Sequence, residues 1–277
     1  MITDFINKII NGDSSEILYE LPSKSVDLVI TSPPYSDLRK YDGVGKTWNE
    51  NRFREIAVGL YDVLKDGGVV VWIVNDKTEK GSKSLVSFQQ ALYFQKVGFN
   101  VNDVMIWQKP NYMPQISQPR YSDCFEYMFI FSKGKPKTFN PLKIPCKCAG
   151  QEYKSTTKNM GGENGRTYKE FNINKEKVKP NIWEIAVAKN KTKHPAVFPE
   201  QLVIDHILSW SNEGDIVLDP FMGSGTTALA CIKTNRKYIG IELNKEYVDL
   251  AEERIKPLSE LPPPKGRGFL IQRHGLH

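Results

Sequence analysis

Short apolar runs that alternate with helical stretches constrain the fold of this chain more than any other feature. The pattern predicts strands at residues 8–11, 26–31, 68–74, 101–107 and 127–131, and helices at 52–64 and 84–97. The alternation resumes near residue 199, with helices at 199–210, 226–234 and 245–255 and strands at 216–218 and 238–241. Strands and helices in alternation predict an α/β fold in which helices cover a mostly parallel sheet.

The segment between the two alternating blocks, residues 135–190, has a different character. Its periodicity fades, and Gly161, Gly162 and Gly165 mark turns. Residues 133–193 contain 14 Lys and 1 Arg against 5 Glu and no Asp, a net charge of +10 in a chain that totals +6. This segment is either a solvated lysine-rich loop or a surface that binds nucleic-acid phosphates. We expect four parts: residues 1–134 and 191–256 as two halves of one domain, 135–190 as an insert, and 257–277 as a loosely ordered tail.

The composition favours a cytoplasmic protein that has no membrane segment. No apolar run approaches the roughly 20 residues that span a bilayer, and the first residues lack the basic and apolar regions of a signal peptide. Four irregularly spaced cysteines fit a reducing compartment. Cys146 and Cys148 have no second pair at the spacing of zinc ligands, so no metal site is expected.

A glycine-rich segment directly follows the strand predicted at 216–218 and opens a helix. Its residues are Asp219, Pro220, Phe221, Met222, Gly223, Ser224, Gly225, Thr226 and Thr227. Glycines here let the backbone approach a ligand, and the carboxyl end of a strand is where open α/β sheets hold nucleotides. The segment lacks the GxxxxGK[ST] pattern of a phosphate-binding loop, which favours a cofactor without phosphates. A tight strand-to-helix turn without a ligand is the alternative.

An acidic residue, Glu242, ends the next predicted strand, about 20 residues after the glycine-rich segment. A carboxylate at this distance is placed to accept hydrogen bonds from the hydroxyl groups of a ribose. A solvated strand end or a helix cap is the more common role of a single Glu, but its distance from the glycines favours the ribose interpretation.

A second motif, Thr31-Ser32-Pro33-Pro34-Tyr35, follows the strand at 26–31. Two consecutive prolines restrict the backbone and have no N–H donors, so the carbonyls here can act as rigid acceptors. A Ser hydroxyl, a fixed carbonyl and an aromatic ring together suit a flat base that carries an amino group. A proline-rich turn that only ends a strand is the alternative.

With these two motifs the chain resembles the S-adenosylmethionine (SAM)-dependent DNA amino-methyltransferases in which the catalytic motif precedes the SAM-binding motif. Thr31–Tyr35 is similar to their (S/D/N)PP(Y/F) motif, and Asp219–Thr227 to their SAM-binding motif. SAM carries ribose and adenine but no phosphate, in agreement with both cofactor features. The resemblance implies a seven-stranded, Rossmann-like methyltransferase sheet in permuted order, with a small inserted target-recognition region at residues 135–190.

The resemblance also implies roles for individual residues. Ser32, Pro33, Pro34 and Tyr35 would be catalytic. His194 resembles part of an element beside the methionine end of SAM, and Asp13 an acidic turn near the adenine. The cofactor-binding residues would be Asp13, Thr31, His194, Asp219, Pro220, Phe221, Gly223, Ser224, Gly225, Thr226 and Glu242.

The implied reaction transfers a methyl group to an exocyclic amino nitrogen of a base that is flipped out of duplex DNA. In this family Ser in the first motif position is associated mainly with the N4 atom of cytosine and Asp with the N6 atom of adenine. Ser32 therefore favours cytosine, with adenine as the alternative. A methyltransferase for RNA or for a protein amide, and an inactive DNA-binding module, are further alternatives. A cognate restriction endonuclease is a further partner to consider, and both a monomer and a homodimer are compatible with the sequence.

Overall fold

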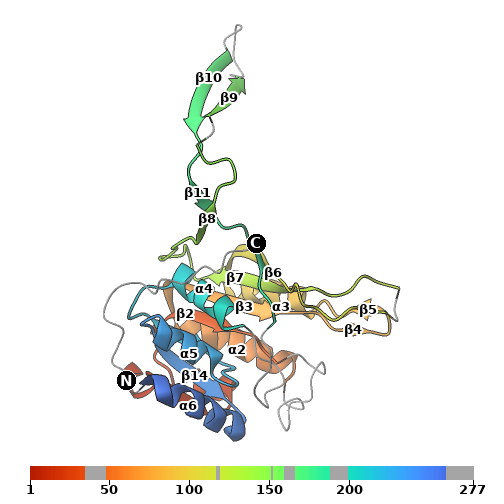
Figure 1. The fold of residues 1–277 in the computed structure, drawn as a ribbon. Coiled ribbons are helices and arrows are strands. Elements are labelled where there is room, and N and C mark those ends of the chain that lie inside the picture. Colours follow the sequence, from red (N-terminus) through yellow and green to blue (C-terminus); the bar gives the residue numbers. More distant parts are fainter. Residues whose placement is uncertain (35–47, 117–118, 151, 159–165, 188–198, 260–277) are drawn as a thin grey trace. The chain divides into compact units, whose positions relative to one another are not determined.

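The structure is a computed structural model that describes residues 1–34, 48–116, 119–150, 152–158, 166–187 and 199–259 (Figure 1). Its internal contacts divide the chain into two compact units. The first comprises Met1–Asn140 and Asn181–His277, and the second comprises Pro141–Pro180. Each unit is described here by itself.

The first unit is built on an eight-stranded sheet. Side by side, its strands are β1 (Lys8–Asn11), β14 (Lys237–Glu242), β13 (Ile216–Asp219), β2 (Val26–Thr31), β3 (Leu64–Val74), β7 (Phe125–Ser132), β6 (Asn100–Gln108) and β12 (Ile182–Glu184). The strands from β1 to β3 in this order are parallel, whereas β7 is antiparallel to both β3 and β6. The α/β class and the seven predicted strands are confirmed. The eighth strand, β12, was not predicted and pairs parallel with β6.

Helices cover the sheet in two groups (Figure 1). α1 (Ser14–Ile17), α2 (Glu50–Val63) and α3 (Val86–Val97) contact one another in sequence, as do α4 (Glu200–Trp210), α5 (Thr226–Lys233) and α6 (Lys245–Ser259). α2 also packs on β3, and α4 packs on β2. A 3-10 helix, Ile2–Asp4, precedes β1, and a hairpin of β4 (Thr78–Glu79) and β5 (Ser82–Lys83) follows β3. α6 continues through Pro257 to Ser259, so the helix extends into the predicted tail.

Alternating residues of β3 place apolar side chains on both faces of the sheet. On one face Trp72 lies between Phe53 of α2 and Phe94 of α3, with ring centroids 5.9 and 5.0 Å away, and Phe94 stacks on Phe131 at 4.5 Å. Val71, on the opposite face, is also completely buried. Because both faces exclude water, the hydrophobic effect fixes the sheet between its two groups of helices. None of the helices in the described ranges has the length and apolar character needed to cross a bilayer.

The second unit is a two-stranded antiparallel ribbon in two segments. β8 (Lys143–Pro145) pairs with β11 (Glu176–Val178), and β9 (Glu152–Lys158) pairs with β10 (Arg166–Asn172). The backbone N–H of Lys179 donates to the carbonyl of Leu142 at 2.8 Å, so the chain enters and leaves the ribbon at adjacent points. The ribbon lies within the residues predicted as an insert.

Candidate functional site

The two motifs follow neighbouring strands at the centre of the sheet. In the parallel pair of β2 and β13, Leu28 lies beside Val217 and Val29 beside Leu218. β2 leads through α2 to β3 on one side, whereas β13 leads through α5 to β14 on the other. The connections therefore diverge beyond the carboxyl ends of β2 and β13. Open α/β sheets bind their ligands at such a switch point.

Asp219, at the end of β13, holds the two motifs together. Its Oδ1 accepts hydrogen bonds from the Thr31 hydroxyl at 2.7 Å and from the Phe221 N–H at 3.0 Å, and its Oδ2 accepts one from the Thr227 hydroxyl at 2.6 Å. The side chain is almost completely buried, which raises the pKa of the Asp219 carboxyl to about 6 although all three donors act to lower it. Asp219 thus connects β2, β13 and α5 around one carboxylate.

The glycine-rich loop between β13 and α5 is fixed by side chains from other parts of the first unit. Ser14 donates its hydroxyl hydrogen bond to the Pro220 carbonyl. Arg254 of α6 donates to the Ser224 hydroxyl at 2.8 Å. The ring of Phe221 lies edge-on to Trp48, with centroids 5.2 Å apart. The loop is therefore shaped before any ligand binds.

Gly225, the residue that precedes α5, has a reason for being glycine that lies within the protein. Its φ of +82° is in the left-handed region, and a Cβ at this position would lie 2.9 Å from the Cβ of Ala251 in α6. The motif predicted that this glycine allows a close approach of the cofactor. Packing of the loop against α6 already requires a glycine here, whether or not a cofactor is bound.

Glu242, at the end of β14, presents a buried carboxylate to the same loop. Its Oε2 accepts from the Gly223 N–H at 2.8 Å, its Oε1 accepts from the Asn244 N–H at 2.9 Å, and 8% of the residue is exposed. Burial raises the pKa of Glu242, and these backbone N–H groups oppose that change. No cation pairs with it among the residues that the structure describes. Each carboxylate oxygen can accept a further hydrogen bond, which suits the two hydroxyl groups of a ribose.

The acidic turn after β1 lies next to Glu242. The side-chain amide of Asn11 donates to the carbonyls of Glu242 and Leu243, each at 3.0 Å, and Gly12 N–H donates to the Glu242 carbonyl at 3.0 Å. Asp13 caps α1 by accepting from the Ser15 N–H at 2.9 Å and forms an ion pair with Arg52 of α2. The turn thus brings Asp13 to the edge of the sheet where Glu242 and the glycine-rich loop lie.

The predicted catalytic segment begins at this edge. Ser32 and Pro34 are half-buried and Pro33 is buried directly after β2. Tyr35 and His194 lie outside the described residues. The structure brings the other predicted site residues to one edge of the sheet, namely Asp13, Thr31, Ser32, Pro33, Pro34, Asp219, Pro220, Phe221, Gly223, Ser224, Gly225, Thr226 and Glu242.

Sequence reasoning missed Arg52, Arg254 and Ser14, each of which contacts a predicted site residue. No local pattern signals these three residues, because each contact joins positions that lie far apart in the sequence. Thr227, whose hydroxyl donates to Asp219, lies inside the glycine-rich motif, so the motif itself could have indicated this residue.

The chain matches a known protein family and several known proteins. The N6/N4 methyltransferase family model, described as DNA methylase, matches residues 26–253. The orphan methyltransferase M.BamHII of Bacillus amyloliquefaciens is 51% identical over 245 residues, which cover 84% of this chain and 89% of that protein. The DNA adenine methyltransferase YhdJ of Escherichia coli is 30% identical over 262 residues, which cover 89% of this chain and 82% of that protein.

Solved structures share the fold. The cytosine-N4-specific PvuII DNA methyltransferase superposes with a TM-score of 0.64 at 23% identity, covering 93% of this chain and 87% of that one. M1.HpyAVI in complex with SAM superposes with a TM-score of 0.58 at 28% identity, covering 89% of this chain and 98% of that one.

Proposed function

Because the chain belongs to the N6/N4 DNA methylase family and is a SAM-dependent DNA methyltransferase, we propose that its target is the N4 amino group of cytosine in duplex DNA. The observation that carries this proposal is Ser32, placed directly after β2 beside the Asp219 loop. Ser at this position is the family feature associated mainly with cytosine.

The residues after β2 suit an exocyclic amino group, whose lone pair is delocalised into the ring and is a poor nucleophile. The hydroxyl of Ser32 and the carbonyl of Pro33 accept hydrogen bonds from its two N–H groups and favour a nitrogen with an available lone pair. Pro33 and Pro34 have no N–H groups that would compete for these acceptors. Positioning and electrostatics, rather than a covalent intermediate, then lower the barrier.

The predicted cofactor-binding residues suit SAM, because the buried carboxylate of Glu242 can accept hydrogen bonds from a ribose. Glu242 would accept the ribose hydroxyls, the Gly223–Gly225 backbone would lie beside the cofactor, and Asp13 would lie near the adenine. When bound, SAM supplies an electrophilic methyl group. Through its hydrogen bond to Asp219, Thr31 sets the position of Ser32 relative to the cofactor loop.

The target base is inaccessible inside a duplex and must be flipped out of the stack. Tyr35 would stack on the face of the flipped base, and Ser32 and Pro33 would bind its amino edge. Unpaired or damaged bases are easier to extrude. The enzyme would therefore act fastest on a target base that is already unpaired.

The ribbon of residues 141–180 would read the target sequence. It carries eight Lys and one Arg against four Glu. The major groove of B-DNA admits a two-stranded β-ribbon, where side chains can contact base edges while cations bind phosphates. The predicted recognition insert, residues 135–190, includes this ribbon.

Adenine N6 is the second candidate target, because the relative YhdJ is a DNA adenine methyltransferase. Two measurements on genomic DNA from a host that expresses this protein distinguish cytosine from adenine as the target. Single-molecule sequencing locates the methylated positions, and mass spectrometry of the hydrolysed nucleosides identifies the methylated base. We expect N4-methylcytosine at one sequence motif, absent from a host that expresses the Ser32→Ala variant. N6-methyladenine alone would reject cytosine as the target. Methylation confined to RNA or protein, or SAM binding without any turnover, would reject the proposed function.

A further inference from the structure

The connection between β6 and β7 leaves the sheet at the edge where the proposed site lies. Gln108 at the end of β6 pairs with Phe125 at the start of β7, and Tyr127 pairs with Val74 at the carboxyl end of β3. We name the described part of this connection, residues 109–116 and 119–124, the arm. The arm thus begins and ends on the side of the sheet where Ser32 follows β2.

The arm exposes large apolar side chains. Met113, Ile116 and Tyr121 are 87%, 93% and 98% exposed, and Tyr112 is 44% exposed. Single apolar residues on a surface are ordinary, but several on one short connection beside an active site mark a binding surface.

Polar contacts fix the arm although its apolar side chains lie in solvent. The Lys109 N–H donates to the Cys124 carbonyl at 2.7 Å, and the Gln115 N–H donates to the Ser122 hydroxyl at 2.8 Å. The side-chain oxygen of Asn111 accepts from the Val187 N–H at 2.8 Å. The base and the middle of the arm are therefore ordered before a partner binds, which lowers the entropic cost of binding.

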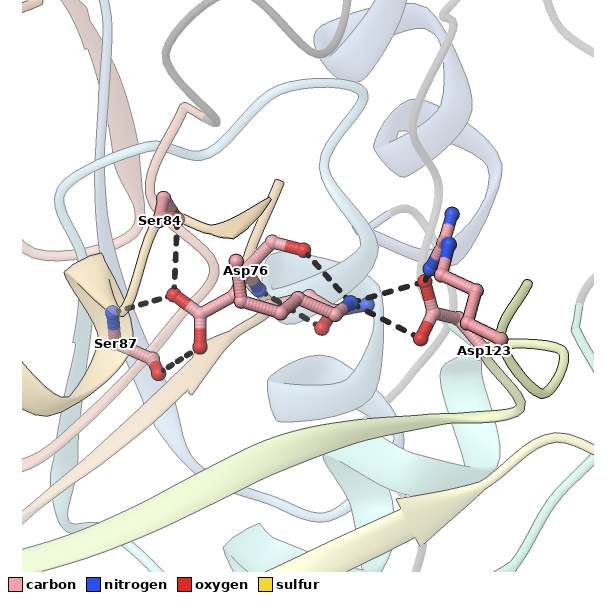
Figure 2. A network of polar contacts seen from close by, with 7 residues as sticks. Asp76, Ser84, Ser87 and Asp123 are labelled. Atoms are coloured by element: carbon pink, nitrogen blue, oxygen red, sulfur yellow. Dashed lines mark hydrogen bonds and ion pairs between the residues drawn. The ribbon is translucent and has the colours of Figure 1, made fainter. Parts of the chain in front are cut away.

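A network of polar contacts connects the arm to the hairpin of β4 and β5 (Figure 2). Lys83 Nζ donates to both Asp123 oxygens, at 3.0 and 2.9 Å, and to the Asp76 carbonyl at 3.3 Å. Asp123 also pairs with Arg120.

The Asp76 carboxylate, on the other side of the network, accepts from the Ser84 hydroxyl at 3.1 Å, the Ser87 N–H at 3.1 Å and the Ser87 hydroxyl at 2.5 Å. This carboxylate is buried and binds the start of α3. Lys83 therefore joins Asp123 of the arm to Asp76, which binds the start of α3.

We propose that the arm is a wedge that enters the DNA duplex beside the target base, with Met113, Ile116 and Tyr121 filling the space that the flipped base leaves. This inference rests on the proposed methylation of duplex DNA. Proteins stabilise an unstacked base step by inserting apolar side chains such as Ile and Met. Lys83 is the positioning residue that holds the wedge at the site.

Duplex DNA is the occupant that the arm and its surroundings fit. The arm leaves the edge of the sheet at which a flipped base must arrive. Residues 77–83 of the adjoining hairpin contain three Lys against one Glu. Lys80, at the tip of this hairpin, is exposed, so its cation is available to a phosphate.

The test compares the Met113→Ala/Ile116→Ala double variant and the Tyr121→Ala variant with wild type on two duplexes. Both contain the mapped methylation site, and in one of them the target base lies opposite an abasic position. Unstacking is least costly for an unpaired base. We expect kcat/KM to fall about tenfold or more on the paired duplex and less than about threefold on the other. SAM affinity should not change.

Leu92→Ala, at an apolar residue of α3 that is 67% exposed, is the matched control and should behave like wild type. Lys83→Met should reproduce the effect of the arm variants, and Lys83→Arg should restore most of the activity. 2-Aminopurine at the target position should brighten less when the arm variants bind.

Equal activity of wild type and the arm variants on the paired duplex would overturn the proposal. Equal losses on both duplexes would also overturn it. If wild type methylates neither duplex, the proposed function itself fails, so the two failures are distinguishable.

Discussion

The hydroxyl of Thr31 donates a 2.7 Å hydrogen bond to Oδ1 of Asp219, whose other oxygen accepts from Thr227. Thr31 precedes the proposed catalytic Ser32, and Thr227 lies in the helix that follows the glycine-rich loop. One buried carboxylate therefore contacts both the proposed base-binding side and the proposed cofactor side of the site.

Thr31→Val and Thr227→Val each remove one donor from Asp219 at nearly constant volume. We expect each to lower the free energy of unfolding by about 1.5–3 kcal/mol, because a buried charged group loses a hydrogen bond. Thr31→Val should mainly lower kcat, and Thr227→Val should mainly weaken SAM binding. Urea unfolding, steady-state kinetics and calorimetry measure these effects. If the two variants change kcat and SAM affinity to the same extent, the two hydrogen bonds of Asp219 do not have separate effects on catalysis and on cofactor binding.

Ser32→Ala should lower turnover about 10²–10³-fold, the usual loss when one preorganised hydrogen-bonding group is removed from an active site. SAM affinity should stay within about twofold, because Ser32 is proposed to bind the base. Single-turnover methylation and SAM calorimetry test both statements. Ser23→Ala, at an exposed serine, is the control. A Ser32→Ala variant with the wild-type rate would remove Ser32 from the mechanism.

Glu242→Gln should weaken SAM binding by about 1.5–3 kcal/mol, the value of a hydrogen bond to a charged group. The amide is nearly isosteric and keeps one acceptor oxygen, so the fold should survive. Glu246→Gln, at an exposed residue in the first turn of α6, should bind SAM normally. Calorimetry measures the SAM affinity of both folded variants. Equal SAM affinities would show that Glu242 does not bind the ribose.

Asp219 should lower stability as the pH rises. Its pKa of about 6 in the folded protein exceeds its ordinary value of 3.8, so the folded state binds more protons between these two pH values. The contribution of Asp219 to the free energy of unfolding therefore decreases as the pH rises from about 3.8 to about 6. The total decrease is about 3 kcal/mol. Asp219→Asn removes this ionisation. Its unfolding free energy relative to wild type should be about 2 kcal/mol higher at pH 7.5 than at pH 4.5. A difference that does not vary with pH would contradict the assignment.

Lysines of the ribbon should set the salt dependence of DNA binding. Lys147, Lys175 and Lys177 are exposed in the second unit. Replacing each by Gln should weaken binding to all sequences alike and flatten the slope of log affinity against log salt by about one. Lys96→Gln, in the last turn of α3, is the control. An unchanged slope in all three ribbon variants would exclude these lysines from phosphate contact.

The sequence predicted the strands that are buried on both faces, because continuous apolar runs identify them. It did not predict β12, whose three residues form a strand only by pairing with β6, a contact about 75 positions away. The ribbon was also missed. Its strands are short or rich in Lys, Thr and Glu, with no continuous apolar run that would identify them.

In the site, the sequence predicted residue types but not their contacts. Glu242 was predicted from its distance to the glycines, and the structure adds the Gly223 N–H that orients its carboxylate. The motif predicted that Gly225 lets the backbone approach the cofactor. A Cβ at this position would instead collide with Ala251 of α6, and no local sequence pattern indicates how α6 packs. Arg254 escaped notice for the same reason.

The strand order has a consequence for synthesis of the chain. β1 is made before the other strands, yet within the described residues it pairs in the sheet with β14 alone, which ends at Glu242. β13 and β14 must enter between β1 and β2, both of which have already left the ribosome. Until then the edge of β2 that later pairs with β13 lacks its partner, and unpaired edges of this kind favour aggregation. Because these contacts join residues far apart in the sequence, we expect slow folding of the sheet, completed only after β14 has been synthesised.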